Sequence, residues 1–390
     1  MFDPARFIHD RVRGIDASGI RRVFDLAAKL KDPVNLSIGQ PEFDVPQPIK
    51  DAAIHAIEDG FNRYTPTQGT AELRAEVVDH LVQQFPDWKG SLDEGGESSV
   101  LITSGVSGAL VLAILSTVGP GDEVLIPDPY FVMYKHLVNL AGATPVYVDT
   151  YPDFQVTAER LARHLTPRTK LLLLNTPANP TGTVIPLEEC GRIVKLCDEH
   201  GVLLISDEIY DEFCYEKVSL RPGDPETLPS PALFSDRVLL MRGFSKTWAM
   251  TGWRLGYVAG PRAIVDQMTK LQQYSFVCAP SMVQAAGVVA LRTDVSDHVA
   301  AYAARRDRVI RRLSERYELA APGGAFYAFP RVPEKLGLTG SQFVERAVER
   351  GLLIIPGGVF SQRDTHFRLS YACADAMLDR GLDMLLELAK

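Results

Sequence analysis

The sequence predicts an α/β protein with a large domain, whose mostly parallel sheet carries helices on both faces, and a smaller α+β domain. Three observations lead to this prediction. The chain of 390 residues is long enough for about two domains. Hydrophobic residues make up 46% and charged residues 23%, which is typical of a folded protein with a large core. Short apolar runs alternate with helix-like segments up to about residue 260.

The predicted strands are runs in which apolar residues follow one another. Strands that helices cover on both faces carry apolar side chains at nearly every position, so such runs indicate a buried, largely parallel sheet. The runs lie at residues 100–103, 124–126, 144–148, 171–174, 202–206, 238–241 and 255–259.

The predicted helices divide the rest of the chain. Segments 46–59 and 186–200 each have proline in the first turn and glycine just past the end, the usual asymmetry of helix ends. Residues 281–315 resemble one long helix. The first forty residues hold helical pieces and no strand run of their own. We therefore expect an N-terminal arm (1–45) that joins the small domain, a large domain (46–285) and a small C-terminal domain (286–390).

Charge and apolar length exclude two classes of partner. The chain has 41 basic and 49 acidic residues, a net charge of −8, so no nucleic-acid partner is expected. No dense basic run indicates a membrane surface. The longest apolar stretch, residues 109–118, is shorter than the roughly 20 residues that span a bilayer.

Cysteine and histidine usage points to a cytoplasmic protein without a metal. The five cysteines are widely spaced and form no CxxC pair, and the eight histidines show no ligand spacing. The first residues contain no apolar core of a signal peptide. A reducing, cytoplasmic location is therefore expected.

Four polar segments follow directly after predicted strands. In an open parallel sheet, ligands bind outside the carboxyl ends of the strands, so these segments should meet at one edge. The segments are 104–108 (SGVSG), 175–182 (NTPANPTG), 207–210 (DEIY) and 243–246 (GFSK).

Two of these segments are ambiguous when each is taken alone. The Ser104–Gly108 turn enters a helix, where free N–H groups and Ser107 would suit a phosphate, but an ordinary turn has the same appearance. The prolines and glycine of 175–182 form a tight loop in which Asn179 could face a ligand or only bond the backbone.

The other two segments carry charged side chains. Asp207 follows a buried run, where a carboxylate is costly unless paired, although it could instead cap the next helix. Lys246 stands among apolar residues, which favours a nucleophilic amine, although a packed lysine stem with a hydrated head is the common alternative. Arg254 could clamp a phosphate or form a surface ion pair. Together, a lysine nucleophile, an acidic partner and a phosphate cup are what pyridoxal phosphate requires.

Eight segments make the sequence resemble a known family, the class I/II pyridoxal-phosphate aminotransferases of fold type I, the aspartate-aminotransferase-like group. They occur in the family's order between about residues 38 and 372. They are IGQPEFDVP (38–46), RYTPTQGTAELR (63–74), PDPYFVMY (127–134), NTPANPTG (175–182), SDEIY (206–210), GFSKTWAMTGWRLG (243–256), GGAFYAFP (323–330) and FRLSYA (367–372).

The resemblance implies a role for each matching residue. Lys246 would carry pyridoxal 5'-phosphate and move the substrate proton, with Asp207 on the ring nitrogen and Tyr210 on the ring hydroxyl as further catalytic groups. Arg368 would bind the substrate α-carboxylate and Gly39 would close over it, while Asn179 would contact both substrate and cofactor. The remaining cofactor contacts would come from Val106, Ser107, Phe131 (with Tyr130 as neighbouring alternative), Asn175, Ser245, Arg254 and, across a dimer, Tyr64.

The resemblance also implies the reaction and the partners. An amino group would pass between an L-amino acid, aspartate or aromatic, and a 2-oxo acid such as 2-oxoglutarate by a ping-pong mechanism, in a homodimer with shared active sites. Two alternatives stay open at this point. One is a C–S β-lyase with the same cofactor. The other is a pyridoxal-phosphate-sensing regulator, which would need a DNA-binding module before this domain; the fewer than forty residues that precede Gly39 are not strongly basic and argue against it.

Overall fold

In this computed structural model, residues 2–16, 19, 32–85, 88, 96–219 and 226–390 are described. At its centre lies a seven-stranded sheet of order β2-β8-β7-β6-β5-β3-β4, in which only β8 runs against the others. Its strands are β2 (Ser98–Thr103), β3 (Glu123–Asp128), β4 (Thr144–Asp149), β5 (Thr169–Asn175), β6 (Leu203–Asp207), β7 (Leu239–Gly243) and β8 (Gly256–Pro261). Each of the seven predicted runs therefore lies in or overlaps a strand.

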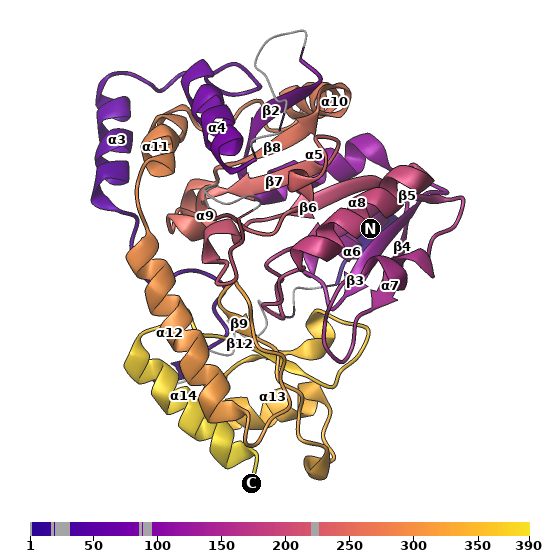
Figure 1. The fold of residues 1–390 in the computed structure, drawn as a ribbon, viewed down its shortest axis with the longest axis vertical. Coiled ribbons are helices and arrows are strands. Elements are labelled where there is room, and N and C mark those ends of the chain that lie inside the picture. The colour runs from indigo at the N-terminus through magenta and orange to yellow at the C-terminus, as the bar shows by residue number, and fades with distance from the viewer. Residues whose placement is uncertain (1, 17–18, 20–31, 86–87, 89–95, 220–225) are drawn as a thin grey trace.

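Helices cover both faces of this sheet, as predicted (Figure 1). Side chains alternate along each strand, so Leu171 and Leu173 of β5 join one core while Leu172 and Leu174 join another. One face carries α5 (Gly105–Thr117), α6 (Met133–Leu140) and α10 (Arg262–Gln273). The opposite face carries α3 (Gln47–Glu58), α4 (Ala71–Gln84), α7 (Ala158–Ala162), α8 (Leu187–His200) and α11 (Ser281–Leu291).

A smaller unit of helices and short strands, here called the C-terminal unit (residues 296–390), lies below the sheet in Figure 1. Its three-stranded antiparallel sheet has the order β11-β12-β9. The elements are α12 (Ser296–Leu313), β9 (Tyr327–Ala328), α13 (Gly340–Glu349), β10 (Leu352–Leu353), β11 (Ile355–Pro356), β12 (Phe367–Ser370) and α14 (Asp375–Leu388). Ion pairs such as Arg312–Asp383 join α12 to α14.

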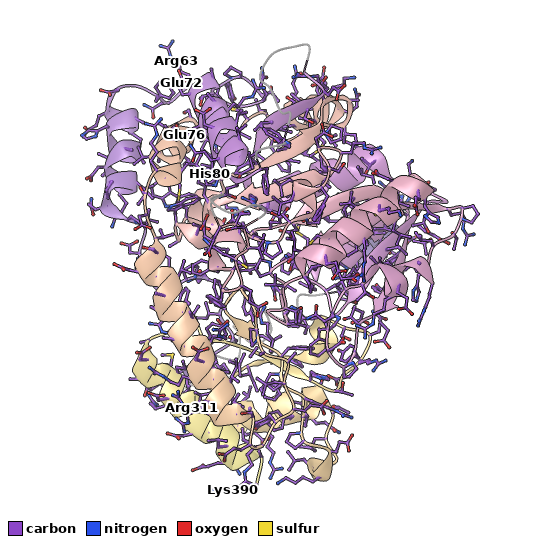
Figure 2. All side chains as sticks on the ribbon, viewed as in Figure 1. Arg63, Glu72, Glu76, His80, Arg311 and Lys390 are labelled. Carbon is purple, nitrogen blue, oxygen red and sulfur yellow. The ribbon has the colours of Figure 1, made fainter. Side chains whose placement is uncertain are left out.

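The predicted long helix over 281–315 is wrong: the structure breaks it into α11 and α12. Asp294 accepts hydrogen bonds from the backbone N–H and hydroxyl of Ser296, a local bonding pattern that competes with the helix. At the break, Arg292 pairs with Glu76 of α4, which is labelled in Figure 2. The break lets α11 pack against α3 and α4 while α12 continues to the C-terminal unit.

The N-terminal segment contains a strand that was not expected. Val34–Asn35 form β1, which pairs in parallel with β10 of the C-terminal unit. Helical pieces precede it, η1 (Pro4–Phe7) and α1 (Asp10–Arg13), and Asp16 forms an ion pair with Lys135 of α6.

The domain boundaries predicted at residues 45 and 285 stay a proposal, and residue 285 falls inside α11. Within the described part of the chain, no helix combines the length and apolarity needed to cross a membrane.

Candidate active site

A cavity of about 390 Å³ lies where the carboxyl ends of β5, β6 and β7 meet the segments of the C-terminal unit. The parallel strand direction explains why residues distant in sequence meet at this edge. The cavity is lined by Ile38, Gly39, Gln40, Val106, Ser107, Leu110, Phe131, Asn175, Asn179, Asp207, Ile209, Tyr210, Ser245, Lys246, Thr251, Arg254, Tyr327 and Arg368. Every residue that the sequence analysis assigned to the site is in this lining except Tyr64.

One end of the cavity is formed by the first turn of α5 and the side chain of Arg254. The first N–H groups of a helix lack partners within the helix, and here Val106 and Ser107 occupy that turn. The guanidinium of Arg254 lies close to the backbone of Gly105, whose φ is +67°: a Cβ on Gly105 would lie 2.6 Å from Nη2 of Arg254. Arg254 itself has a left-handed φ of +55°. A strained arginine beside a free helix start forms an anion-binding cradle.

Lys246 follows β7, in the short helix α9 (Phe244–Thr247), and its amine enters the cavity. Its Nζ donates a hydrogen bond of 2.6 Å to the carbonyl of Gly39. Burial lowers the pKa of Lys246 to about 8, and the positive charges of Arg368 and Arg254 act in the same direction. A buried lysine with this lowered pKa has a larger share of neutral, nucleophilic amine than an exposed one.

Asp207 ends β6 and is fully buried at the base of the cavity. Burial raises the pKa of Asp207 to about 6, although the hydroxyl of Tyr134 donates a 2.7 Å hydrogen bond to its Oδ2. Asn175 holds the same strand end, since its Nδ2 donates to the Asp207 carbonyl and its Oδ1 accepts from the Asn179 N–H. A buried carboxylate held in this way is a suitable partner for a cationic N–H group of a ligand.

Arg368 on β12 faces the cavity from the C-terminal unit. Its Nη1 donates to Oδ1 of Asn179 at 3.0 Å, and its Nη2 donates to the carbonyl of Ser37 at 2.8 Å. Its Nε is buried without a hydrogen-bond partner. A guanidinium that still has donors free inside a cavity can bind a carboxylate bidentately.

Aromatic side chains complete the walls. Phe131 lines the cavity, whereas the neighbouring Tyr130 does not and instead bonds Gln362 through its hydroxyl. Of these two neighbours, only Phe131 borders the cavity, and its stacking role stays a prediction. The hydroxyls of Tyr210 and Tyr327 lie 2.9 Å apart and hydrogen-bond to each other.

Tyr64 is the predicted site residue that this chain does not bring to the cavity. Its side chain is 86% exposed, and it lines a separate surface hollow together with Phe61 and Arg63. Its predicted role depends on a second copy of the chain.

Two tyrosines at the site were missed by the sequence analysis. Tyr134 and Tyr327 lie inside segments that match the family, PDPYFVMY and GGAFYAFP, but both sit at core positions of a helix or strand. No local signal shows that either hydroxyl meets a polar group far away in sequence. Also missed were the lining residues Ile38, Gln40, Leu110, Ile209 and Thr251.

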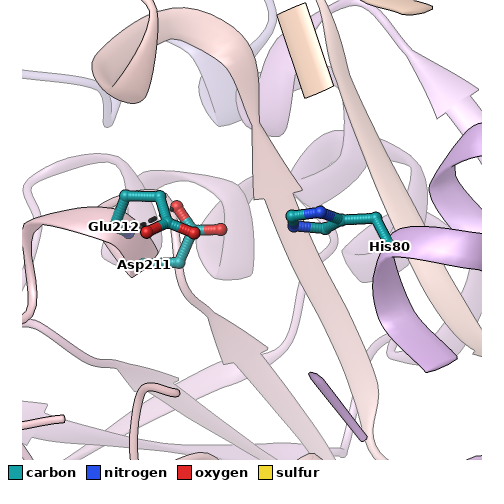
Figure 3. A group of neighbouring side chains, drawn as sticks. All are labelled: His80, Asp211 and Glu212. Atoms are coloured by element: carbon teal, nitrogen blue, oxygen red, sulfur yellow. Dashed lines mark hydrogen bonds between the residues drawn. The ribbon is translucent and has the colours of Figure 1, made fainter. Parts of the chain in front are cut away.

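A group of possible metal ligands lies outside the cavity lining. His80 of α4 faces Asp211 and Glu212, and their ligand atoms lie within 4.8 Å of one another (Figure 3). Both carboxylates already have cationic partners, Arg242 at 3.4 Å from Asp211 and Lys217 at 2.8 Å from Glu212. Because the protein's own cations compensate these charges, we assign no metal to the group.

The cavity residues fit pyridoxal 5'-phosphate on three structural grounds. The cradle of Arg254, Gly105 and the start of α5 suits a phosphate, because added side-chain atoms would close it. The buried amine of Lys246 suits an aldehyde. The buried carboxylate of Asp207 suits a protonated ring nitrogen.

Comparisons with known proteins agree with this fit. The family model "Aminotransferase class I and II" matches residues 31–385. An aspartate aminotransferase of Pyrococcus abyssi is 36% identical, with 96% of each chain covered. An aromatic-amino-acid aminotransferase of Thermococcus litoralis is 35% identical, with 98% of each covered.

Solved structures give the same result. An aspartate aminotransferase of Thermus thermophilus with maleate has a TM-score of 0.88 and 32% identity, over 98% of this chain and 99% of that one. The fold is therefore that of pyridoxal-phosphate enzymes of fold type I. With the family model, the relatives and the cavity in agreement, the chain belongs to the class I and II aminotransferases, a family of enzymes that use pyridoxal phosphate.

Proposed function

We propose that the protein moves an amino group between an L-amino acid, aspartate or aromatic, and a 2-oxo acid such as 2-oxoglutarate, by a ping-pong mechanism. The observation that carries this proposal is the meeting of Lys246, Asp207 and Arg368 in one buried cavity. The substrate class is supported by relatives that are named aspartate and aromatic-amino-acid aminotransferases.

Cofactor binding is assigned to the sheet-edge residues. Val106, Ser107, Ser245 and Arg254, which line the cavity, would hold the phosphate, and Asp207 would hold the ring nitrogen. Tyr210 and Asn179 would contact the ring hydroxyl, and Phe131 would stack on the ring. Asn175 supports Asn179 and the Asp207 strand end. The bound cofactor supplies the carbonyl that takes up the amino group and the ring that accepts the electrons of the cleaved Cα–H bond.

Substrate binding is assigned to Arg368 and the backbone at Gly39. The free N–H donors of Arg368 donate to both oxygens of the substrate α-carboxylate, which fixes the orientation of the Cα–H bond. The side-chain oxygen of Asn179 accepts a hydrogen bond from Arg368 and so keeps the guanidinium in place. The Gly39 segment lies over the same region, since its carbonyl contacts Lys246.

Lys246 carries the proton in this scheme. Lys246 would hold the cofactor through its Nζ, and its free amine would act as the general base that takes the proton from the substrate Cα and as the acid that gives it back. A pKa of about 8 suits this task, because the amine is neutral in a useful fraction of molecules near neutral pH.

The assembly is proposed to be a cytoplasmic homodimer with shared active sites. In it, Tyr64 of each subunit reaches the phosphate of the other. Its exposure in the single chain is compatible with a role that needs a second copy.

Initial rates with both substrates varied test this function. We expect parallel double-reciprocal lines with aspartate or an aromatic amino acid against 2-oxoglutarate, and an amino-acid product. Lys246→Ala should lose activity entirely. Release of pyruvate and ammonia from a cysteine-like substrate, without transfer, would instead identify a C–S β-lyase. Intersecting lines or an active Lys246→Ala variant would contradict the proposed mechanism.

A further inference from the structure

The second cavity tyrosine, Tyr327, contacts both the substrate-binding arginine and the cofactor-binding tyrosine. It stands on β9, directly beside β12, in register with Ser370. Its ring lies 4.5 Å from Cζ of Arg368, and its hydroxyl lies 2.9 Å from that of Tyr210. The roles of Arg368 and Tyr210 rest on the proposed function, whereas these contacts do not.

Arg368 needs support because no counter-ion for it is found among the described residues. Its exposed fraction is 1%, and no carboxylate among the described residues forms a salt bridge with it. Its polar partners are one amide oxygen and one carbonyl oxygen, both neutral. An isolated charge in such surroundings is costly, so other contacts must keep the guanidinium in place before a substrate arrives.

Two aromatic rings provide that contact. Cζ of Arg368 lies 4.5 Å from the centre of the Tyr327 ring and 4.7 Å from that of Phe360. Both rings are buried, and a cation over an aromatic face gains most where water is excluded. Ring contacts use no N–H donor, so they hold Arg368 without occupying the donors that a carboxylate needs.

The Tyr327 hydroxyl has a separate effect. A tyrosine hydroxyl has a single hydrogen, so Tyr210 can donate it to only one acceptor. If Tyr210 donates to the cofactor hydroxyl oxygen, the bond between the two tyrosines must run from Tyr327 to Tyr210. The same hydroxyl lies 2.9 Å from where a Cβ on Gly39 would be, which leaves room for little besides glycine there.

We propose that Tyr327 is a positioning residue with two separable actions. Its ring holds Arg368 in the orientation that binds the substrate carboxylate. Its hydroxyl donates a hydrogen bond to Tyr210, so that the O–H of Tyr210 points toward the cofactor oxygen. One side chain thereby couples the substrate-binding and cofactor-binding halves of the site.

Two substitutions separate these actions. Tyr327→Leu removes the ring and should raise KM for both the amino acid and the 2-oxo acid by at least about tenfold, with a smaller effect on kcat. The dissociation constant of 3-phenylpropionate, a carboxylate without an amino group, should rise by the same factor when measured by cofactor absorbance. Tyr327→Phe keeps the ring, so KM should stay within about twofold. It should raise the pH midpoint of the visible absorbance of the loaded enzyme, because Tyr210 then donates less strongly to the cofactor oxygen.

Tyr317→Phe is the matched control for the hydroxyl. Tyr317 is also buried, and its hydroxyl donates to the Leu385 carbonyl in the core of the C-terminal unit. This variant loses the same atom and should change neither KM nor the absorbance midpoint. Circular dichroism and cofactor content confirm that each variant is folded and loaded.

The outcomes distinguish this inference from the proposed function. If the wild type transaminates but a folded, loaded Tyr327→Leu keeps its KM and its affinity for 3-phenylpropionate, the ring action is wrong. An absorbance midpoint that stays unchanged in Tyr327→Phe, or moves equally in Tyr317→Phe, contradicts the hydroxyl action. A wild type without transamination overturns the proposed function instead.

Discussion

Two arginines are buried to nearly the same degree in this protein, yet they differ in their charged partners. Arg242 on β7 is 0% exposed, and Arg368 on β12 is 1% exposed. The guanidinium of Arg242 donates to Glu208 through both Nε and Nη2, lies 3.4 Å from Asp211, and stands over the ring of Phe85. Arg368 has two neutral oxygens as partners and an Nε without one.

The electrostatics of the two arginines differ in the same way. Although burial alone would lower it, the carboxylates of Glu208 and Asp211 raise the pKa of Arg242. For Arg368, burial prevails and its pKa is lowered. The charge of Arg242 is thus compensated by carboxylates of the protein, whereas the charge of Arg368 can be compensated by a ligand. Burial alone does not separate a structural charge from a functional one, but the presence of a counter-ion does.

Among the substitutions that test this comparison, the largest expected effect is the loss of stability when Arg242 is replaced. Arg242→Met would leave Glu208 and Asp211 buried without a cation, and should lower the free energy of unfolding by about 3–5 kcal/mol. Denaturant unfolding of the cofactor-loaded enzyme measures it. KM of the molecules that remain folded should change little, so a stable variant with a strongly raised KM would contradict a structural role.

The same substitution at the other arginine should act on binding instead. Arg368→Met removes a charge that has no counter-ion in the described part of the chain, so the melting temperature should not fall. Because charge-assisted hydrogen bonds to the substrate carboxylate are lost, kcat/KM should drop at least about a hundredfold. Thermal unfolding and steady-state kinetics on the two Met variants give a direct comparison. Loss of stability without loss of substrate affinity would reverse the assignment.

A smaller effect is expected where a neutral group supports a buried carboxylate. Tyr134→Phe removes the hydrogen bond that lowers the pKa of Asp207, so this pKa should rise further above about 6. A larger share of Asp207 is then protonated near neutral pH and cannot pair with the ring nitrogen. Near neutral pH, the affinity of the Tyr134→Phe variant for pyridoxal phosphate should therefore be about tenfold lower, and it should recover as the pH rises.

Titrating cofactor-free enzyme with pyridoxal phosphate across the pH range measures the Tyr134→Phe effect, and Tyr317→Phe again serves as the control. An affinity loss that is the same at every pH would argue for a packing defect rather than an effect on Asp207.

The smallest effect concerns the lysine. The rate at which cofactor-free enzyme takes up pyridoxal phosphate should follow the neutral amine of Lys246, rising with pH to a midpoint of about 8 instead of 10.5. Since Asp207 raises the pKa of Lys246, Asp207→Asn should move the midpoint lower. Stopped-flow absorbance gives both curves. A midpoint near the ordinary lysine value, or an upward shift in Asp207→Asn, would contradict the burial argument.

The sheet was predictable because burial under helices on both faces requires an apolar residue at each successive strand position. A strand such as β5, with leucines facing both helical layers, must be apolar at successive positions, and the polar residues after it must lie at the carboxyl edge. Asp207, Asn179 and Lys246 were singled out for that reason. Parallel direction then placed them together without knowledge of any contact.

What escaped prediction depends on contacts between distant segments. Tyr134 and Asp207 are 73 positions apart, and Tyr327 and Tyr210 are 117 apart, so no local pattern shows that their hydroxyls meet a partner. The two-residue strand β1 forms only because β10 is there to pair with it. The break between α11 and α12 rests on the side chain of Asp294, within a segment that otherwise suits a helix.

The central claim is that this cavity carries out aminotransfer through Lys246, and the visible absorbance of the purified, cofactor-loaded enzyme tests it most directly. The account predicts a band of lysine-bound cofactor that bleaches when aspartate or an aromatic amino acid is added. The band should return when 2-oxoglutarate is added and should be absent from Lys246→Ala. A wild-type band that no amino acid bleaches, or no band after addition of pyridoxal phosphate, would contradict the claim.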